Sequence, residues 1–278
     1  MTPWAGCRLP HPLSVPMARF KIVIPARFGS TRLPGKPLLP LAGKPMIVHV
    51  CERALQTAAD EIVVAVDDER IAEAVKALPV RPLLTRTDHA SGTERLVEVA
   101  QRLTWDDRVL VVNLQGDEPL LNPGLVDRLA EAFAGQQRAE VATLAAPIGA
   151  AEELFDPNAV KVVFDRHGLA LYFSRAPIPW ARDAFSGGQR ALPDGASYWR
   201  HIGIYAYTAG FLRRYSAWAA SALERVECLE QLRILWQGEP IYVLPVANPP
   251  AAGVDTEADL SRVEQLLEDA RSDRRALP

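Results

Sequence analysis

The sequence has few cysteines, and none is spaced like a disulfide framework or a zinc site. Its 278 residues include three, Cys7, Cys51 and Cys228, and no Cys-x-x-Cys pair. An odd number of scattered cysteines is typical of a chain in a reducing compartment. We therefore expect a cytoplasmic protein without structural disulfides.

Long apolar runs and a strong excess of one charge are also missing. No stretch approaches the roughly 18–20 apolar residues that a membrane-spanning helix needs, so we expect no membrane insertion. The formal net charge is −3, which gives no general attraction to nucleic acid. Hydrophobic residues make up 49% of the chain and charged residues 23%, as in an ordinary globular protein.

The two ends of the chain differ from its body. Residues 1–17 contain prolines but no continuous apolar core, unlike a secretory signal, and a strand-like run begins directly after them. We expect a disordered leader or an upstream start there. The body, residues 18–267, is expected to form one α/β domain, and residues 268–278 a flexible tail.

Short apolar strands alternate with helical segments in the first half of the chain. Strands are predicted at residues 20–25, 61–66, 80–85, 109–114 and 141–146. Strands that are apolar on both faces indicate a mostly parallel central sheet with helices on each side. Ligands bind beyond the carboxyl ends of such strands, so the loops that begin at Ala26 and Gln115 are the first places to search for a site.

The rhythm changes after residue 157. Residues 160–164 and 169–174 predict a β-hairpin rather than a βαβ unit, and residues 176–197 predict a long mobile loop. Together they form an insertion at about residues 157–200. Strands are also predicted at residues 201–207 and 241–246.

Two helices are expected near the end of the chain. The first covers residues 221–236, where Ser221 and Glu224 form a capping box. Its core face is expected to hold four apolar residues at helical spacing, Val226, Leu229, Leu232 and Leu235. The second helix begins after Thr256, which has Asp259 at capping distance.

The loop after the first predicted strand combines cations, hydroxyls and glycines. Its polar side chains are Arg27, Ser30, Thr31, Arg32 and Lys36. A polyphosphate is bound by such a mixture, because glycines let backbone N–H groups approach and cations offset the phosphate charge. A solvated basic loop is the alternative, and the position after a buried strand favours the phosphate site. The sequence lacks G-x-G-x-x-G and G-x-x-x-x-G-K-[ST] in this loop, which disfavours a nicotinamide dehydrogenase and a P-loop phosphohydrolase.

Two distant aspartates follow predicted strands. Asp117 comes after residues 109–114, and Asp255 comes after residues 241–246 and a proline-rich turn. Mg²⁺ is usually held by one or two carboxylates together with phosphates and water, so the pair is a candidate magnesium site. The alternatives are a turn residue for Asp117 and a helix cap for Asp255. The spacing of Thr256 and Asp259 already provides the cap, which favours another role for Asp255.

Several sequence blocks together resemble one family. Residues 25–37 (PARFGSTRLPGKP) resemble the signature loop of sugar nucleotidyltransferases, in the form found in cytidylyltransferases that activate acidic sugars. Further blocks match this family in its own order: GKPMIVHV (43–50), TDHASGTER (87–95), NLQGDEP (113–119), YFSRAPIPW (172–180), RHIGIY (200–205), LEQLR (229–233) and GVDT (253–256). The resemblance covers about residues 18–267. It is strongest to the branch that activates 3-deoxy-D-manno-octulosonate (KDO).

The resemblance implies a fold and a reaction. The fold would be a Rossmann-like, three-layer nucleotidyltransferase domain over residues 18–267, with the small hairpin region serving dimerisation. The reaction would transfer CMP from CTP to KDO for lipopolysaccharide biosynthesis, in a homodimer that depends on Mg²⁺ held by Asp117 and Asp255. Lys36 and Arg32 would act with these aspartates as the catalytic residues.

The resemblance also assigns binding residues. Arg27, Ser30, Thr31, Arg32, Lys36, Ser91, Thr93, Arg95 and Gln115 would bind the nucleotide, and His201, Tyr205, Glu230 and Gln231 would bind the sugar. From the residues alone, Arg95 is equally a surface cation of a helix, His201 a structural histidine, and Glu230 and Gln231 a solvated helix face. Arg175 and Arg182 are weaker candidates for the sugar carboxylate.

Two other functions stay open at this point. One is a cytidylyltransferase for a different acidic sugar, 8-amino-KDO or sialate. The other is a non-catalytic sensor of nucleotides or sugars that keeps the fold, which the presence of Lys36, Asp117 and Asp255 disfavours.

Overall fold

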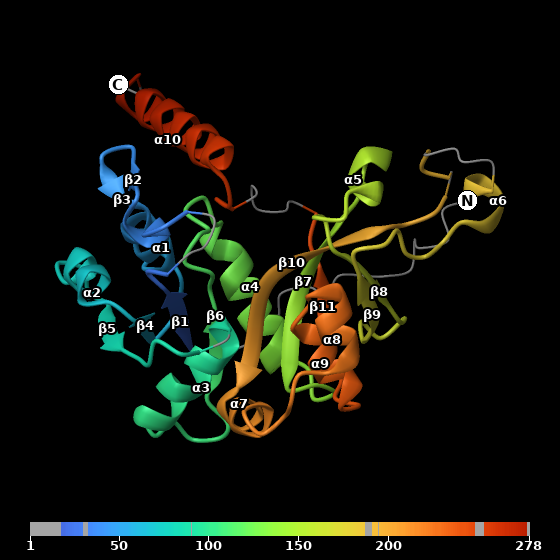
Figure 1. Ribbon diagram of the computed structural model, residues 1–278, viewed down its shortest axis with the longest axis horizontal. Coiled ribbons are helices and arrows are strands. Elements are labelled where there is room, and N and C mark those ends of the chain that lie inside the picture. Colours follow the sequence, from blue (N-terminus) through green and yellow to red (C-terminus); the bar gives the residue numbers. More distant parts are fainter. Residues whose placement is uncertain are drawn as a thin grey trace. The chain divides into compact units, whose positions relative to one another are not determined.

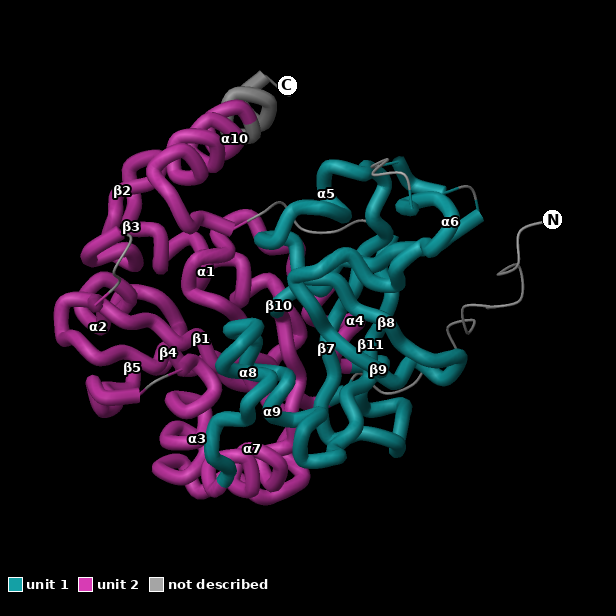
Figure 2. The backbone as a smooth tube through the Cα atoms, turned by 45° about the vertical axis from the view of Figure 1, so that its right-hand side comes forward, with its two compact units in different colours: residues 1–18, 131–203, 218–249 teal, residues 19–130, 204–217, 250–278 magenta. Residues whose placement is uncertain are grey.

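The computed structural model (Figure 1) describes residues 18–29, 33–89, 91–186, 191–193, 195–247 and 253–276. These residues form two compact units (Figure 2). Unit 1 comprises residues 1–18, 131–203 and 218–249, and unit 2 comprises residues 19–130, 204–217 and 250–278. The expected leader, residues 1–17, lies outside the described residues, as do Ser30, Thr31 and Arg32.

Unit 2 contains a largely parallel sheet. Its parallel strands lie in the order β6 (Leu110–Asn113), β1 (Phe20–Ala26), β4 (Glu61–Val66) and β5 (Arg81–Leu84). The end of β10 (Trp199–Thr208) pairs antiparallel with β6, with Tyr205 opposite Asn113. Almost every side chain of β1, β4 and β6 is buried, which explains why uninterrupted apolar runs mark them in the sequence. The strands predicted at residues 20–25, 61–66, 80–85 and 109–114 are confirmed.

Helices cover both faces of this sheet. The crossovers β1–β4 and β4–β5 carry α1 (Met46–Ala54) and α2 (Glu69–Val75), which pack on each other, and the return crossover to β6 carries α3 (Gly92–Arg102), which packs on α7 (Ala209–Tyr215). Since crossovers are right-handed, the change of direction before β6 places α3 on the opposite face. The predicted three-layer architecture is confirmed.

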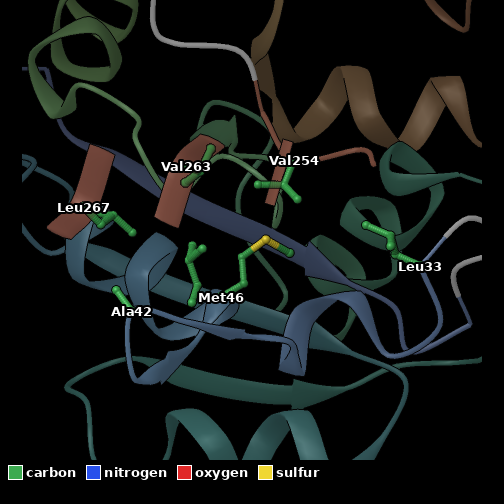
Figure 3. Packing of buried hydrophobic residues seen from close by; sticks show 7 residues of the cluster. Leu33, Ala42, Met46, Val254, Val263 and Leu267 are labelled. Carbon is green, nitrogen blue, oxygen red and sulfur yellow. The ribbon is translucent and has the colours of Figure 1, made fainter. Parts of the chain in front are cut away.

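A buried cluster ties the end of the chain to its beginning within unit 2 (Figure 3). It contains Leu33, Leu41, Ala42, Met46, Val254, Val263 and Leu267, of which the last two lie on α10 (Glu257–Ala276). Leu33 belongs to the loop after β1, and Val254 directly precedes Asp255. Apolar packing therefore brings residues about 220 positions apart to the same end of the sheet.

Unit 1 combines parallel strands with a hairpin. β7 (Val141–Pro147) pairs in parallel with β11 (Tyr242–Pro245), and β8 (Lys161–Phe164) pairs antiparallel with β9 (Ala170–Ser174). Asp165 closes the hairpin by accepting hydrogen bonds from the backbone N–H groups of His167 (2.7 Å) and Leu169 (2.9 Å). The predicted hairpin is confirmed. The other helices of this unit are α5 (Ala151–Phe155), α6 (Arg182–Phe185), α8 (Ala222–Glu227) and α9 (Gln231–Trp236), and α4 (Pro123–Ala134) has its last residues here.

The single helix expected over residues 221–236 is wrong. The predicted capping box of Ser221 and Glu224 is present, but the helix ends at Cys228, which has a left-handed φ of 51°. A new helix, α9, follows, and Val226, expected in the core, is 83% exposed. Because the helix breaks at Cys228, Leu229 is buried while Val226 is exposed. The apolar residues that predicted one helix are therefore divided between α8 and α9 and the turn that joins them.

Two further segments are more regular than expected. The predicted loop at residues 176–197 contains α6, and part of it, residues 187–190 and 194, lies outside the described residues. Residues 268–276 of the expected tail continue α10. Among the described residues, none of the helices has both the length and the apolar composition needed to cross a bilayer.

Candidate active site

A cavity of about 290 Å³ lies in unit 2, next to the carboxyl ends of β1 and β6. The loop after β1, the start of α3, the loop after β6 and the residue two positions before α10 contribute to its lining. Seven residues predicted from the sequence line it: Arg27, Lys36, Ser91, Arg95, Gln115, Asp117 and Asp255. The cavity therefore lies beyond the strand ends, where the sequence predicts a site, and the roles of its residues stay predictions.

Lys36 joins the two aspartates that the sequence separates. Its ammonium Nζ lies 2.6 Å from Asp117 Oδ2 and 3.1 Å from Asp255 Oδ1. The Lys36 side chain is only 12% exposed, whereas those of Asp117 and Asp255 are 34% and 55% exposed. Two carboxylates that would repel each other are thus held together by one nearly buried cation, with their outer surfaces open to ligands.

Two glycines allow the strand ends to approach this closely. A Cβ atom at Gly116 would lie 2.9 Å from the carbonyl oxygen of Pro25, and one at Gly253 would lie 3.0 Å from the carbonyl oxygen of Asp117. That carbonyl also accepts a hydrogen bond from Val254 N at 2.9 Å. The positions of both aspartates therefore depend on backbone contacts that a side chain at either glycine would disturb.

The helix cap next to Asp255 is made by its neighbours. Thr256 Oγ1 accepts a hydrogen bond from Asp259 N at 3.2 Å, and Asp259 Oδ2 accepts one from Thr256 N at 3.0 Å. This reciprocal pattern satisfies the first turn of α10. The interpretation of Asp255 as the helix cap is wrong, as the spacing indicated.

The acidic pair suits magnesium. Within the described part of the chain, no group of three or more histidine, cysteine, aspartate or glutamate side chains gathers as a metal site, and zinc usually requires at least three such ligands. Magnesium needs only one or two carboxylates when phosphates and water complete its shell. Asp117 and Asp255 both contact the Lys36 ammonium, so two carboxylates of the kind that Mg²⁺ binds lie at one end of the cavity.

Arg95 is a buried residue and not a surface cation. It is 3% exposed, its Nη1 donates to Thr85 Oγ1 at 2.6 Å, and its Nη2 lies 3.2 Å from Asp67 Oδ2. The alternative of a surface helix cation is therefore wrong, and Thr85 and Asp67 hold the guanidinium inside the protein. Its role as a nucleotide ligand stays a prediction.

Two predicted nucleotide-binding residues, Ser91 and Thr93, lie at the start of α3. Ser91 caps the helix by accepting a hydrogen bond from Glu94 N at 3.2 Å, and it also lines the cavity. Thr93 is 3% exposed and is not among the residues that line the cavity.

Sequence reasoning overlooked His89 and Asp67. His89 lines the cavity, and its Nε2 lies 2.5 Å from Glu98 Oε2. His89 belongs to the block TDHASGTER, whose resemblance to the family is a signal that could have identified it. Its contact with Glu98 depends on how α3 packs and is not visible in the sequence. Nothing in the sequence separates Asp67 from the neighbouring Asp68, which caps α2 by accepting a hydrogen bond from Arg70 N.

The four predicted sugar residues are divided between the units. His201, Glu230 and Gln231 belong to unit 1, and Tyr205 belongs to unit 2. Their gathering at one sugar site therefore stays a prediction. Gln231 is 8% exposed, and its Nε2 has no hydrogen-bond partner in the part of the chain that the structure describes. Gln231 is thus not on the solvated helix face considered for it.

His201 is held neutral. Its Nε2 lies 3.1 Å from Thr143 Oγ1, and its ring meets Phe173 edge to face at 5.1 Å. Burial lowers the pKa of His201 to about 3, and the neighbouring charge of Arg200 acts in the same direction. A neutral imidazole can donate or accept a hydrogen bond but brings no positive charge to a carboxylate.

The two weaker arginine candidates differ. Arg175 donates from Nε to the carbonyl oxygen of Glu227 at 2.7 Å and from Nη1 to that of Pro157 at 2.9 Å. Arg182 is exposed and pairs with its neighbour Asp183. Arg175 therefore has a structural task, and the role of either in binding the sugar carboxylate stays a prediction.

Comparisons with known proteins agree on one family. A family model described as "Cytidylyltransferase" matches residues 21–241. Among curated proteins, a 3-deoxy-manno-octulosonate cytidylyltransferase of Methylococcus capsulatus is 62% identical over 90% of this chain and 97% of its own length. One of Hahella chejuensis is 55% identical over 90% and 98%. A solved structure of CMP:2-keto-3-deoxy-manno-octonic acid synthetase complexed with CTP has a TM-score of 0.82 and 45% identity, over 91% of this chain and 99% of that one.

Proposed function

Since the chain belongs to the cytidylyltransferase family, we propose that it transfers the CMP group of CTP to the anomeric hydroxyl of KDO and releases pyrophosphate. The single observation that carries this proposal is the junction of Lys36 with Asp117 and Asp255 at the cavity of unit 2. The names of the relatives, which match this chain along almost their whole length, support KDO as the sugar.

The reaction needs no covalent nucleophile from the protein. The anomeric oxygen of KDO forms a bond to the α-phosphorus of CTP, the bond from that phosphorus to the bridging oxygen breaks, and the hydroxyl proton is lost. The protein accelerates this displacement by orienting both substrates and by offsetting charge on the leaving pyrophosphate. Lys36 supplies a nearly buried cation for that charge, and Arg27, which is exposed beside the cavity, supplies a second one. Arg32 is assigned to the same task.

Asp117 and Asp255 would hold Mg²⁺. When bound there, the ion would neutralise phosphate oxygens and lower the pKa of a coordinated hydroxyl. Both carboxylates are partly exposed, at 34% for Asp117 and 55% for Asp255, so a metal ion can reach them. Ser91 and Gln115 also line the cavity and are assigned, with Thr93, to the ribose and base. Arg95 is assigned to the nucleotide, and Ser30 and Thr31 are assigned to its triphosphate.

The sugar assignment follows the chemistry of the side chains. KDO carries several hydroxyl groups, and His201, Tyr205, Glu230 and Gln231 offer neutral donors and acceptors and one carboxylate. The unpartnered, buried amide of Gln231 is the group with most to gain from a ligand, because a buried polar atom without a partner is costly.

The remaining assignments concern the setting of the enzyme. We assign it to lipopolysaccharide biosynthesis in the cytoplasm and to a homodimer. The hairpin of β8 and β9 is the proposed contact surface of the dimer, since it carries Leu171, which is 64% exposed.

The test is pyrophosphate release with a panel of substrates. The purified protein is supplied with Mg²⁺, with CTP or UTP, and with KDO, 8-amino-KDO or sialate. We expect release with CTP and KDO at a kcat/KM at least about tenfold above any other pair. A preference for 8-amino-KDO or sialate would contradict the sugar assignment. If calorimetry shows that CTP binds but none of the three sugars is turned over, the proposed enzymatic function is wrong and a non-catalytic sensor is favoured.

A further inference from the structure

Phe28 lies in the loop after β1 that we assign to the phosphates (the phosphate loop, residues 27–36), and three contacts hold it in place. Its N–H donates to Asp67 Oδ1 at 2.8 Å, and its carbonyl oxygen accepts from Gly35 N at 3.1 Å. The guanidinium of Arg70 lies over the Phe28 ring, 3.8 Å from its centre. All four residues belong to unit 2, and Asp67 and Arg70 come from the end of β4 and from α2.

Asp67 is itself fixed by a buried cation. Its side chain is 10% exposed, and its second oxygen, Oδ2, lies 3.2 Å from Arg95 Nη2. Arg95 is 3% exposed and also donates to Thr85 Oγ1 at 2.6 Å. Thr85 is anchored in turn, because its hydroxyl donates to the carbonyl oxygen of Val66 at 2.9 Å. The chain of contacts thus runs from the end of the sheet to the loop through charged groups shielded from water.

The position of Phe28 determines where two cations lie. Arg27 precedes it in the chain, and Lys36 follows Gly35, the residue that donates to the Phe28 carbonyl. Both Arg27 and Lys36 line the cavity. A shift of the Phe28 backbone would therefore move the two groups assigned to the triphosphate.

We propose that Asp67 is a positioning residue of the reaction, which sets the phosphate loop through the N–H of Phe28, and that Arg95 acts on the nucleotide by holding Asp67. This inference rests on the proposed function, since CTP is the ligand whose phosphates the loop would meet. It gives Arg95 a role that its burial and its contacts support better than direct contact with the nucleotide does.

The first experiment removes the charge and keeps the shape. Asp67→Asn leaves an oxygen that can accept from Phe28 N, but it leaves the Arg95 guanidinium without its counter-charge in a buried place. We expect the KM for CTP to rise about tenfold or more, with a smaller change in the KM for KDO. Hydrogen exchange at the Phe28 amide, followed by mass spectrometry on the free protein, should accelerate.

A matched control comes from another carboxylate of unit 2. Asp127 Oδ1 accepts from Ala58 N at 2.9 Å. This is also a contact between a carboxylate and the backbone N–H of a distant residue, but neither residue lines the cavity. Asp127→Asn is expected to lower the melting temperature without changing the KM for CTP. An equal rise of that KM in both variants would reduce the effect of Asp67→Asn to general destabilisation and overturn the proposal.

A double-variant cycle separates positioning from direct binding by Arg95. If Arg95 works only through Asp67, then Arg95→Gln should raise the KM for CTP in the wild-type background but not further in the Asp67→Asn background. An additional rise of about tenfold in the double variant would show direct contact with the nucleotide and contradict the proposal. If Asp67→Asn does not fold, Thr85→Val is measured in its place. This variant removes the second partner of Arg95 and the hydrogen bond from Thr85 to the carbonyl oxygen of Val66, and an unchanged KM for CTP would count against the proposal.

Failure of this inference and failure of the proposed function have different signatures. Wild-type protein that releases no pyrophosphate from CTP and KDO would refute the function. Wild-type protein that is active, with an unchanged KM and unchanged Phe28 exchange in Asp67→Asn, would refute the positioning role alone.

Discussion

The cavity of unit 2 and the polar interior of unit 1 treat their charged groups in opposite ways. In unit 2, Lys36 pairs with Asp117 and Asp255, and the side chains of these two aspartates are 34% and 55% exposed. In unit 1, Lys161 is fully buried and donates to the carbonyl oxygens of Asp156 (2.9 Å) and Arg175 (2.5 Å), and burial lowers its pKa.

The same contrast holds for the acidic and neutral groups of unit 1. Glu227 spends its carboxylate on Ser174 Oγ (2.7 Å) and Arg175 N (2.9 Å), and His201 is neutral because burial lowers its pKa to about 3. Charges that remain accessible can act on a substrate, whereas charges consumed by main-chain contacts hold a scaffold. Under the proposed function, unit 2 would carry the electrostatic part of the chemistry, and His201 and Gln231 of unit 1 would offer neutral groups to the sugar.

The largest expected effect comes from Asp255. Asp255→Asn keeps the size of the side chain but weakens a candidate metal ligand, so kcat with CTP and KDO should fall by at least about 10³-fold. Circular dichroism and the melting temperature should stay near the wild-type values. Asp88→Asn, at an exposed aspartate whose partner is Arg86, is the control and should be fully active. Wild-type-like turnover by Asp255→Asn would remove the main distinction between the two regions.

Removal of Lys36 should have the next largest effect. Lys36→Ala takes away the cation assigned to the leaving pyrophosphate, and the loss of one such group costs about 3–4 kcal/mol, or about 10²–10³ in kcat. The melting temperature should change by less than about 2 °C. Lys44→Ala, which removes an exposed lysine paired with Glu52, serves as the comparison. A fall in kcat of less than about tenfold for Lys36→Ala would defeat its catalytic role.

The neutral state of His201 predicts an effect on stability against acid. In the unfolded chain a histidine has a pKa of about 6.5, so between that pH and about 3 only the unfolded state binds the proton. Stability from this group is complete above pH 6.5 and falls with decreasing pH, by at most about 1.4 kcal/mol per unit. His201→Gln should flatten the pH dependence of the unfolding free energy between pH 6.5 and 4.5, measured by urea titration.

The exposed His167 provides the control for this measurement. His167→Gln replaces a histidine by glutamine at an exposed position, and a flattening as large as that of His201→Gln would count against burial as the cause. An unaltered slope in His201→Gln would show that His201 takes up its proton in the folded protein, and the contrast between charged unit 2 and neutral unit 1 would weaken.

The smallest effect is expected at the capping box of α8. Ser221→Ala removes the hydroxyl that accepts from Glu224 N at 3.1 Å and should cost about 1 kcal/mol of unfolding free energy. The cap lies in the scaffold of unit 1, so kcat should be unchanged. Ser261→Ala, at an exposed position inside α10, should cost much less. A large loss of kcat in Ser221→Ala would mean that the start of α8 contributes to the chemistry.

Most of the sheet could be predicted because burial on both faces leaves a direct trace in the sequence. The runs FKIVIPA and EIVVAV have few polar residues and became β1 and β4. The convergence of Lys36 and Asp117 could be expected as well, because both follow parallel strands whose carboxyl ends lie at one edge of a sheet. Asp255 could be assigned to the same site because the spacing of Thr256 and Asp259 already predicted the helix cap.

The remaining features depend on contacts between distant segments. The helix α8 ends at Cys228 in a left-handed conformation. Glycine is the usual residue at such a helix end, so a cysteine there gives no signal in the sequence. The partners of Arg95, Asp67 and Thr85, lie 28 and 10 positions away, so its burial follows from the packing of α3 and not from its local pattern. A helical arginine in a polar block looks the same from sequence whether it is solvated or enclosed.

The most direct test of the account is the position of a metal ion in the complex with nucleotide. Crystals grown with CTP and Mn²⁺ in place of Mg²⁺ would reveal the ion by its anomalous scattering. The account predicts a peak within ligand distance of carboxylate oxygens of both Asp117 and Asp255, with the triphosphate beside Lys36. A nucleotide bound elsewhere, or an ion that contacts neither aspartate, would contradict it.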